Sequence, residues 1–312
     1  EILIGLVGSE MCIRDSSNLG IVTARGNWKG KTKGGLVRTC DNFKTFDRIG
    51  MPFGINAEID KKLHEIENPN VNAGWVAVSS DGVNIVWSVA DGIRLPVELV
   101  LVSNDGGHSF QKAGVFDLAG QPVETGYLKV FSDRSRKDLF YGFGGASEIY
   151  VSRDGGRNFY QKQPKEAFPV CDFGYIDTAN KTEVRGEGGK TGIFYLALGD
   201  AGLYKLCYDT KTEEIHVKRL TDTGDACYRM GLGVIGEDRD YLTEEKAIYF
   251  CGRLEGEYGF YRTFDEGKSY ERLNQDKQMY GEINSIDGDK RKFGRFFLAT
   301  GSRGVLYGEM KR

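Results

Sequence analysis

The sequence is poor in proline and histidine and has no long apolar run. It contains only 6 Pro and 3 His among 312 residues. No stretch approaches the roughly 20 apolar residues that a membrane-spanning helix needs, so we expect no membrane partner. The histidines at positions 64, 108 and 216 are scattered, and neither a metal triad nor a Ser-His-Asp arrangement can be assembled from them.

The sequence also lacks paired cysteines and a charge excess. The six cysteines, at positions 12, 40, 171, 207, 227 and 251, include no Cys-x-x-Cys pair. Several lie in apolar, strand-like segments, which favours buried reduced thiols over disulfides and over a zinc site. The formal net charge is −3 with both signs interspersed, which offers no basic stripe for nucleic acid. We therefore expect no metal, no cofactor and no nucleic-acid partner.

Glycine and aromatic residues are abundant by contrast. The chain has 43 Gly, and aromatic residues make up 12% of it. This composition is typical of many short strands joined by tight turns, and it argues against long helices. The sequence therefore predicts an all-β protein.

Four stretches repeat nearly the same phrase, at residues 39–46, 103–110, 152–159 and 263–270. Each pairs a hydroxyl residue with an Asp two positions later, usually adds a Gly two further on, and closes on an aromatic residue. This is hairpin chemistry, because Asp accepts hydrogen bonds from turn amides, Gly supplies positive φ and the aromatic residue anchors the returning strand. We interpret these residues as structural and not catalytic: Asp41, Ser103, Asp105, Gly107, Phe110, Ser152, Asp154, Gly156, Phe159, Asp265, Gly267 and Tyr270.

The spacing of these phrases predicts the architecture. The aspartates are separated by 64, 49 and 111 residues, and the last interval is close to twice the one before it. One copy has therefore lost its phrase, and residues 202–209 lie where it should be. A repeat of roughly 50 residues is typical of propeller blades, in which four-stranded sheets stack on their neighbours. We predict a β-propeller of about six to seven four-stranded blades with hairpins of this kind, of the seven-bladed type and truncated at its N-terminus.

Residues 1–16 differ from the rest of the chain in lacking its pattern of strands and turns. The segment has no basic region of a signal peptide, and residues 7–16 resemble translated sequencing-adapter text. We predict that residues 1–16 are a non-native leader, that residues 17–312 form a single β-propeller domain, and that the natural protein extends upstream.

Longer stretches resemble one family of enzymes. Residues 76–88, followed by the strand and turn at 99–110, are similar to the C-terminal propeller of glycoside hydrolase family 74. This family comprises xyloglucanases and oligoxyloglucan reducing-end-specific cellobiohydrolases. Residues 259–274, 278–281 and 294–308 resemble the closing segment of that family in order and spacing. The resemblance runs from about residue 18 to residue 309.

The resemblance implies an inverting hydrolase of xyloglucan or related β-1,4-glucans. Family members have two propellers facing each other across a cleft, with one catalytic Asp near the start of each, and they use one carboxylic acid and one carboxylate. The family's Gly-Asp-(Ile/Val)-Gly-Gly-Phe-like segment is missing here, and Asp15 lies in the predicted leader. We therefore expect no catalytic residue in this chain and no hydrolysis by it alone. The implied partners are plant xyloglucan or its oligosaccharides and the N-terminal propeller of the same chain, and the implied location is extracellular.

Three residues are candidates for binding the substrate. Trp28 lies in a Gly- and Lys-flanked loop and could serve as a saccharide platform or as a loop anchor. Tyr280 lies in a loop that resembles the family's Gln-Tyr-Gly loop, where stacking on a sugar ring competes with packing. Arg229 lies in a stretch that matches a loop facing the family's cleft, where binding a hydroxyl competes with simple solvation.

Two other classes of function remain open at this stage. Hairpins of this kind also occur in non-catalytic propellers that bind carbohydrate or protein, such as sortilin-like receptors, and in sialidases. A sialidase needs an arginine triad and a tyrosine nucleophile, and no clear equivalent is present in the sequence.

Overall fold

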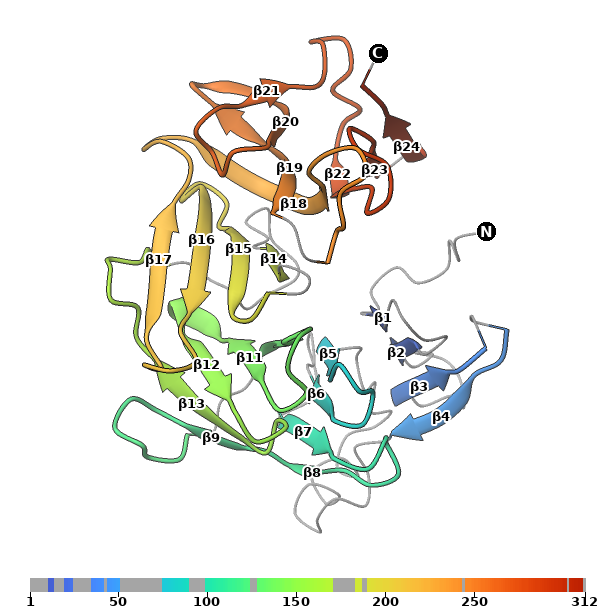
Figure 1. Cartoon of the computed structure of the whole chain (residues 1–312), viewed down its shortest axis with the longest axis vertical. Coiled ribbons are helices and arrows are strands. Elements are labelled where there is room, and N and C mark those ends of the chain that lie inside the picture. The colour runs from blue at the N-terminus through green and yellow to red at the C-terminus, as the bar shows by residue number, and fades with distance from the viewer. Residues whose placement is uncertain are drawn as a thin grey trace, which may run out of the picture. The chain divides into compact units, whose positions relative to one another are not determined.

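Short strands in consecutive antiparallel sheets make up nearly all of the regular structure (Figure 1). The computed structural model describes residues 11–13, 20–24, 35–41, 44–50, 75–89, 99–123, 128–170, 183–186, 190–242, 245–301 and 303–310. The chain divides into two compact units, Glu1–Gln163 and Pro164–Arg312. The described residues form three sheets in each unit.

The three sheets of the first unit follow the order of the sequence. The first sheet contains β1 (Met11–Ile13), β2 (Gly20–Ala24), β3 (Gly35–Thr39) and β4 (Asp47–Gly50). The second contains β5 (Trp75–Val78), β6 (Ile85–Val89), β7 (Leu99–Ser103) and β8 (Gln111–Lys112). The third contains β10 (Lys129–Ser132), β11 (Phe140–Phe143), β12 (Ile149–Ser152) and β13 (Asn158–Lys162), and β9 (Gly114–Phe116) joins its outer edge in parallel. A 3₁₀ turn, η1 (Gly145–Ser147), lies between β11 and β12.

The second unit repeats this plan. The fourth sheet contains β14 (Glu183–Gly186), β15 (Ile193–Ala197), β16 (Leu203–Tyr208) and β17 (Ile215–Arg219). The fifth contains β18 (Ala226–Val234), β19 (Lys246–Leu254), β20 (Glu257–Thr263) and β21 (Glu271–Arg272). The sixth contains β22 (Ile283–Gly288), β23 (Phe296–Thr300) and β24 (Gly304–Gly308).

The first strands of successive sheets contact one another within each unit. In the first unit β5 contacts both β1 and β10, and in the second unit β18 contacts both β14 and β22. Consecutive meanders stacked through their first strands are the arrangement of propeller blades. The predicted all-β class, the four-stranded repeat and the order of strands around each turn are confirmed.

The repeated phrases lie between the third and fourth strands of their sheets, and every copy has a hydrogen bond from its hydroxyl to its carboxylate. Ser103 Oγ donates to Asp105 at 2.7 Å, and the amide of Gly107 donates to Ser103 Oγ at 2.8 Å. Ser109 Oγ donates to the second oxygen of the Asp105 carboxylate at 2.6 Å. The carboxylate therefore closes the turn at both ends, as turn chemistry requires. The corresponding hydroxyl-to-carboxylate bonds of the other copies are Thr39 to Asp41 at 2.9 Å, Ser152 to Asp154 at 2.8 Å and Thr263 to Asp265 at 2.8 Å.

The glycines of these turns combine positive φ with close packing. Gly156 has φ +90°. A Cβ added there would lie 2.2 Å from a methyl carbon of Val86 in the second sheet. Glycine is required at this position both by the backbone conformation and by the approach of the neighbouring sheet.

The copy that lost its phrase lies between β16 and β17. Asp209 accepts hydrogen bonds from the amides of Lys211 and Thr212, at 2.7 and 3.3 Å. It stands 55 residues after Asp154 and 56 before Asp265. The turn keeps its acid and its place in the sheet, but its hydroxyl, glycine and aromatic residues are absent.

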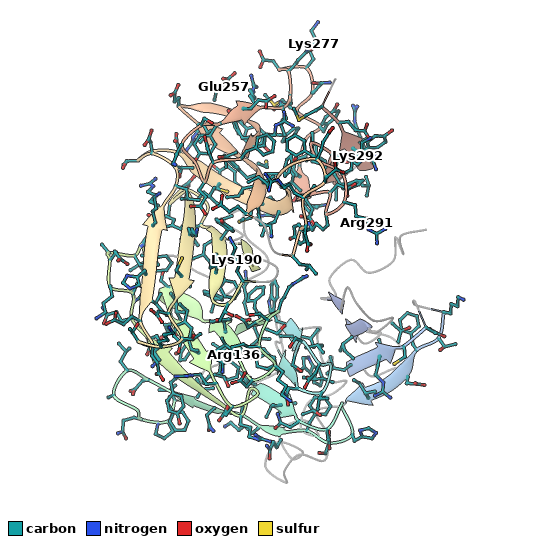
Figure 2. The ribbon with its side chains drawn as sticks, in the orientation of Figure 1. Arg136, Lys190, Glu257, Lys277, Arg291 and Lys292 are labelled. Carbon is teal, nitrogen blue, oxygen red and sulfur yellow. The ribbon has the colours of Figure 1, made fainter. Side chains whose placement is uncertain are left out.

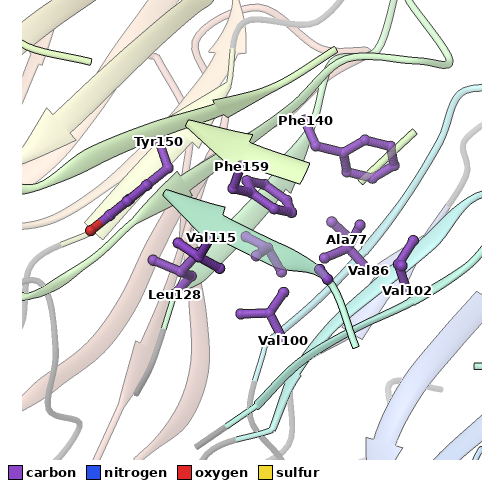
Figure 3. Packing of buried hydrophobic residues seen from close by; sticks show 11 residues of the cluster. Ala77, Val86, Val100, Val102, Val115, Leu128, Phe140, Tyr150 and Phe159 are labelled. Carbon is purple, nitrogen blue, oxygen red and sulfur yellow. The ribbon is translucent and has the colours of Figure 1, made fainter. Parts of the chain in front are cut away.

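The core lies between neighbouring sheets. Figure 3 shows the cluster between the second and third sheets, in which Val86, Val100 and Val102 pack against Phe140, Tyr150 and Phe159. Phe159, the aromatic residue that closes its phrase, is fully buried there. Each sheet therefore gains its core by covering the face of its neighbour, and a strand covered on both faces, such as β11 or β12, is buried at every position.

Part of the N-terminal prediction falls on described residues. Met11–Ile13 form β1 and pair with β2. The assignment of residues 1–16 as a non-native leader, and of residues 17–312 as one domain, stays a prediction.

Candidate functional site

The two ends of each four-stranded sheet carry different chemistry. In an antiparallel meander, the turn between the first and second strands lies at the same end of the sheet as the turn between the third and fourth strands. The repeated Asp-containing turns, which we call the acid turns, join the third and fourth strands and therefore lie at this end. The turn joining strands two and three lies at the opposite end, which we call the hairpin end. The polar side chains of the acid turns are already hydrogen-bonded within the turns. The side chains that are available for binding therefore lie at the hairpin end.

A polar cluster lies at the hairpin end of the fourth and fifth sheets. Tyr228 Oη donates to Asp200 Oδ1 at 2.9 Å, and Arg253 Nη2 lies 3.7 Å from the same oxygen. Asp200 belongs to the turn between β15 and β16, while Arg253 lies near the end of β19. We call these three residues the hairpin cluster. It presents a phenol, a carboxylate and a guanidinium to solvent, a set that can both donate to and accept from sugar hydroxyls.

Backbone contacts hold the two sheets together beneath this cluster. Gly199 and Cys227 exchange two amide-to-carbonyl hydrogen bonds, at 2.9 and 2.8 Å. The turn that carries Asp200 is therefore fixed to the strand that carries Tyr228. Partial burial, together with the hydrogen bond to Asp200, raises the pKa of the Tyr228 phenol above its ordinary value.

A strand irregularity directs Tyr228 to the surface. The register of β18 against β19 shifts between Cys227 and Arg229, which leaves Tyr228 as the extra residue of a bulge. A bulge interrupts the alternation of side chains and can redirect one of them. Tyr228 is accordingly partly exposed between two buried neighbours.

Arg229, one of the three residues predicted to bind substrate, is 8% exposed. Its Nε donates to the carbonyl of Asn284 at 3.1 Å and its Nη1 to the carbonyl of Tyr228 at 2.7 Å. The guanidinium therefore ties β18 to β22 and supports the backbone that presents Tyr228. It lies next to the hairpin cluster and not among its exposed groups.

A second pair of side chains lies further inside the fifth sheet. Tyr258 Oη and Cys251 Sγ are 2.8 Å apart, and burial raises the pKa of the Tyr258 phenol well above its ordinary range. The Cys251 thiol is buried, and Cys40, Cys207, Cys227 and Cys251 form no disulfide.

Tyr280, a second predicted binding residue, lies in the loop before β22 with φ +54°. Its ring stacks on Phe260 with centroids 6.3 Å apart and an interplanar angle of 4°. It is half-buried and lines a cavity of about 420 Å³ between the fifth and sixth sheets. The structure thus gives Tyr280 a packing role on one side and a place on a cavity wall on the other.

Charged residues surround this cavity in pairs. Arg262, 4% exposed in its side chain, pairs with Glu271 at 2.6 Å, and Arg272 contacts both Glu257 and Asp276. Figure 2 shows Glu257 at the edge of the fifth sheet.

Trp28, the third predicted binding residue, lies outside the described residues. Neither Arg229 nor Tyr280 is among the three exposed groups of the hairpin cluster, although Arg229 adjoins it in the sequence. Asp200 and Arg253 were missed because nothing in the sequence marks the turn between β15 and β16 as a partner of β18.

The displaced carboxyl pKa values of the described residues all move downward. The backbone hydrogen bond from Thr45 is the largest cause that lowers the pKa of Asp41 to about 2, and the hydroxyl of Ser269 is the largest that lowers the pKa of Asp265 to about 2. Burial is the largest influence on Glu266 and would raise its pKa, but the hydrogen bonds from Lys205 and Tyr195 and the nearby lysine charges together outweigh burial and lower it. These groups are held as carboxylates, which accept hydrogen bonds and do not supply protons at neutral pH.

Two features are absent from the described residues. Among them no group of three or more His, Cys, Asp or Glu side chains is placed to hold a metal ion. In the same part of the chain no helix is long and apolar enough to cross a membrane.

Comparison with characterised proteins gives relatives of one kind. A xyloglucanase from a Paenibacillus species is 33% identical over 238 residues, which is 76% of this chain and 20% of the relative. Xyloglucanase Xgh74A of Acetivibrio thermocellus is 29% identical over 245 residues, 78% of this chain and 25% of the relative. The oligoxyloglucan-reducing end-specific xyloglucanase of Emericella nidulans is 27% identical over 254 residues, 79% of this chain and 29% of the relative. The chain thus spans between a fifth and a third of the length of these relatives.

Solved structures agree on the fold. The GH74 enzyme of Niastella koreensis superposes with a TM-score of 0.66 at 18% identity, covering 96% of this chain and 36% of that one. YCF48 bound to a D1 peptide gives a TM-score of 0.58 at 13% identity, covering 96% of this chain and 78% of that one. No family model matches the sequence. The propeller class expected from the repeat spacing is confirmed.

Proposed function

Because this chain is a propeller chain of the glycoside hydrolase family 74 xyloglucanase type, we propose that it forms one wall of a binding cleft for xyloglucan or a related β-1,4-glucan. The observation that carries the proposal is its 33% identity with a xyloglucanase over 238 residues. The chain covers only a fifth of that relative, so the activity of the whole protein is part of the proposal.

The hairpin cluster supports a role in binding. Its phenol, carboxylate and guanidinium are fixed relative to one another by the contacts of Tyr228 and Arg253 with Asp200. Fixed polar groups at the end of a rigid sheet lose little conformational entropy when they bind a ligand. A glucan chain offers the hydroxyls that such groups recognise, and an aromatic ring can cover an apolar face of a pyranose.

We further propose that the catalytic carboxyl groups of such an enzyme are supplied by another part of the protein. An inverting glycosidase needs one carboxylic acid with a raised pKa and one carboxylate that activates water. The downward displacement of the carboxyl pKa values described above supports this division, because these groups do not have the properties of a general acid.

A binding assay with the purified chain tests this function. In native gels containing tamarind xyloglucan, the chain is expected to migrate more slowly than in gels without polymer, and no reducing sugar is expected to be released. Tyr228→Phe removes the hydroxyl that bonds to Asp200 and should weaken retardation several-fold. Tyr160→Phe, at an exposed tyrosine of the third sheet, is the matched control.

Two results would contradict the proposal. Migration unaffected by xyloglucan would remove the binding role and favour a propeller that binds protein. Reducing-sugar release above background by the chain would show that it carries its own catalytic acids.

An extracellular site of action follows from the proposed substrate. Xyloglucan is a polymer of the plant cell wall, and an enzyme that cleaves it must meet it outside the cell. Detection of the full-length protein in the culture medium of its source, with little in the cell extract, would agree with this proposal.

A further inference from the structure

The segment that begins β18 adjoins the elements that carry the hairpin cluster. Besides pairing with β19, β18 contacts β14 and β15 of the fourth sheet and β22 of the sixth (Figure 1). Gly252 lets β19 approach β18 closely, because a Cβ at that position would lie 2.0 Å from the carbonyl oxygen of Ala226. From Asp225 to Arg229 the segment is buried at every position except Tyr228, which is partly exposed.

Two opposite charges are buried in this segment. Asp225 is 7% exposed and Arg229 is 8% exposed. A buried charge is costly unless hydrogen bonds replace its hydration, and an apolar side chain of similar size would fill the same space at lower cost. Packing alone therefore does not account for charged residues at these two positions.

Asp225 holds the turn between β19 and β20. Its Oδ1 accepts a hydrogen bond from the amide of Glu255 at 2.8 Å, and its Oδ2 accepts one from the amide of Asp222 at 3.2 Å. Glu255, with φ +50°, and Gly256, with φ +83°, form the two-residue turn of this hairpin. Arg253 stands two residues before Glu255, so the carboxylate fixes the backbone close to the base of that side chain.

Arg229 holds the backbone of Tyr228. Its Nη1 donates to the Tyr228 carbonyl at 2.7 Å, and its Nε donates to the Asn284 carbonyl at 3.1 Å. Between the two buried charges, Cys227 exchanges backbone hydrogen bonds with Gly199 in the turn between β15 and β16. Each turn or strand that carries a member of the hairpin cluster is thus tied to this one segment.

We infer that Asp225 and Arg229 are positioning residues, which hold the backbone of the hairpin cluster in the arrangement that binds ligand. The inference rests on the proposed function of that cluster, and it gives the two buried charges no contact with the ligand. Groups that are already in place lose less conformational entropy on binding. Loss of either charge should therefore weaken binding through the exposed residues, and a chain that lacks those residues should not respond.

The first test observes Tyr228 directly and needs no ligand. In a chain that is isotope-labelled at the Cζ atom of tyrosine, Tyr228→Phe identifies the resonance of Tyr228. Asp200→Ala shows where this resonance lies when the phenol has lost its acceptor. Arg229→Lys lacks the planar fork that reaches both carbonyls, and it should move the resonance towards that position.

Arg262→Lys is the matched control for this substitution. Arg262 is another buried arginine of the fifth sheet, with a side chain 4% exposed and paired with Glu271, but it lies next to the acid turn. The control should lower the melting temperature without moving the Tyr228 resonance. A resonance that moves equally in both variants, or in neither, would overturn the inference.

The second test measures binding in native gels that contain xyloglucan. Arg229→Lys should weaken retardation by about threefold to tenfold, the loss expected of one hydrogen bond, and Arg262→Lys should not weaken it. In a chain that carries Tyr228→Ala, adding Arg229→Lys should cause no further loss. An equal loss in both backgrounds would show that Arg229 acts independently of Tyr228, and the inference would be wrong.

Asp225→Asn keeps the inference testable if Arg229→Lys does not fold. It should weaken retardation of the natural chain but not of a chain that carries Arg253→Ala, and an equal loss in both would contradict a positioning role. If xyloglucan does not retard the natural chain, the proposed function fails. The Tyr228 resonance then still decides whether Arg229 positions that residue.

Discussion

At the scale of single residues, the repeated turns depend on a hydroxyl and a carboxylate whose separation hardly varies. The four hydroxyl-to-carboxylate distances lie between 2.7 and 2.9 Å although the intervening residues differ. In three of the copies a glycine amide returns to the same hydroxyl. This constancy explains why the phrase survives in the sequence, because the hydroxyl and the carboxylate are each held by more than one hydrogen bond.

Gly156→Ala should be strongly destabilising. Alanine would have to adopt φ +90° and place its Cβ 2.2 Å from a methyl carbon of Val86. We expect a loss of about 1–4 kcal/mol in the free energy of unfolding, measured by urea denaturation. Gly145→Ala is the control, since its φ is not positive and its Cβ would meet no atom within 4 Å. Equal losses in the two variants would contradict the steric argument.

Asp265→Asn should change how stability depends on pH. The pKa of Asp265 falls from 3.8 to about 2 in the folded chain, chiefly through the hydroxyl of Ser269. A lowered pKa adds stability that is complete above the unfolded value near 3.8 and is lost as the pH falls towards 2. The stability gap between the natural chain and the variant should therefore be constant from pH 5 to 7 and narrow below pH 4. Urea midpoints measured across this range check it, and a gap that does not vary with pH would disprove it.

At the scale of elements, neighbouring sheets of the second unit are joined by an ion pair. Lys205 on β16 pairs with Glu266 in the turn after β20, and Tyr195 Oη donates to the same carboxylate at 3.3 Å. The two charged side chains are 17% and 25% exposed. Such a partly buried pair is costly to break, because either partner alone is left desolvated.

Lys205→Ala should therefore destabilise the chain by about 1–3 kcal/mol. The double variant with Glu266→Gln should recover part of this loss, because the uncompensated charge is then removed. Denaturation of the two single variants and the double variant forms a thermodynamic cycle. Strict additivity would show that the pair contributes nothing across the two sheets.

Strand positions were largely predictable from the sequence, but the polar cluster was not. The alternation of apolar residues in 75–88 and the Asp-Gly pair at 81–82 are typical of a hairpin, and β5 and β6 form one there. The bulge at Tyr228 has no comparable signature, because it depends on the pairing of β18 with β19. The same pairing buries Arg229, whose charge suggested an exposed side chain. Contacts between residues far apart in the sequence thus decided which of two adjacent polar residues is exposed.

At the scale of the whole molecule, each unit has buried clusters of its own. The cluster around Phe159 lies in the first unit, and the cluster around Phe250 lies in the second. The repeat interval predicts the number and type of sheets, since every copy follows the same plan. It does not predict the division at residue 163, because the local pattern is the same on both sides.

Phe250→Ala should affect the two units unequally. Removing this buried ring costs about 3–5 kcal/mol. We expect faster hydrogen exchange in β15, β16, β18 and β19, with a smaller change in β10 to β13, as for a chain of sheets that depend on their nearest neighbours. Peptide-resolved hydrogen exchange measures both regions at once. Uniform acceleration along the chain would show a single cooperative unit.

The separation of acid turns from the hairpin end has a consequence for how such proteins diversify. One rim of the first five sheets is constrained by the aspartate turns, while the loops at the other rim, such as the one carrying Asp200, are held mainly through backbone contacts. Changes of length or composition in those loops do not alter the acid turns at the opposite end of the sheets. Libraries confined to the β15–β16 and β19–β20 loops should therefore yield more folded variants with altered ligand preference than libraries of equal size in the acid turns.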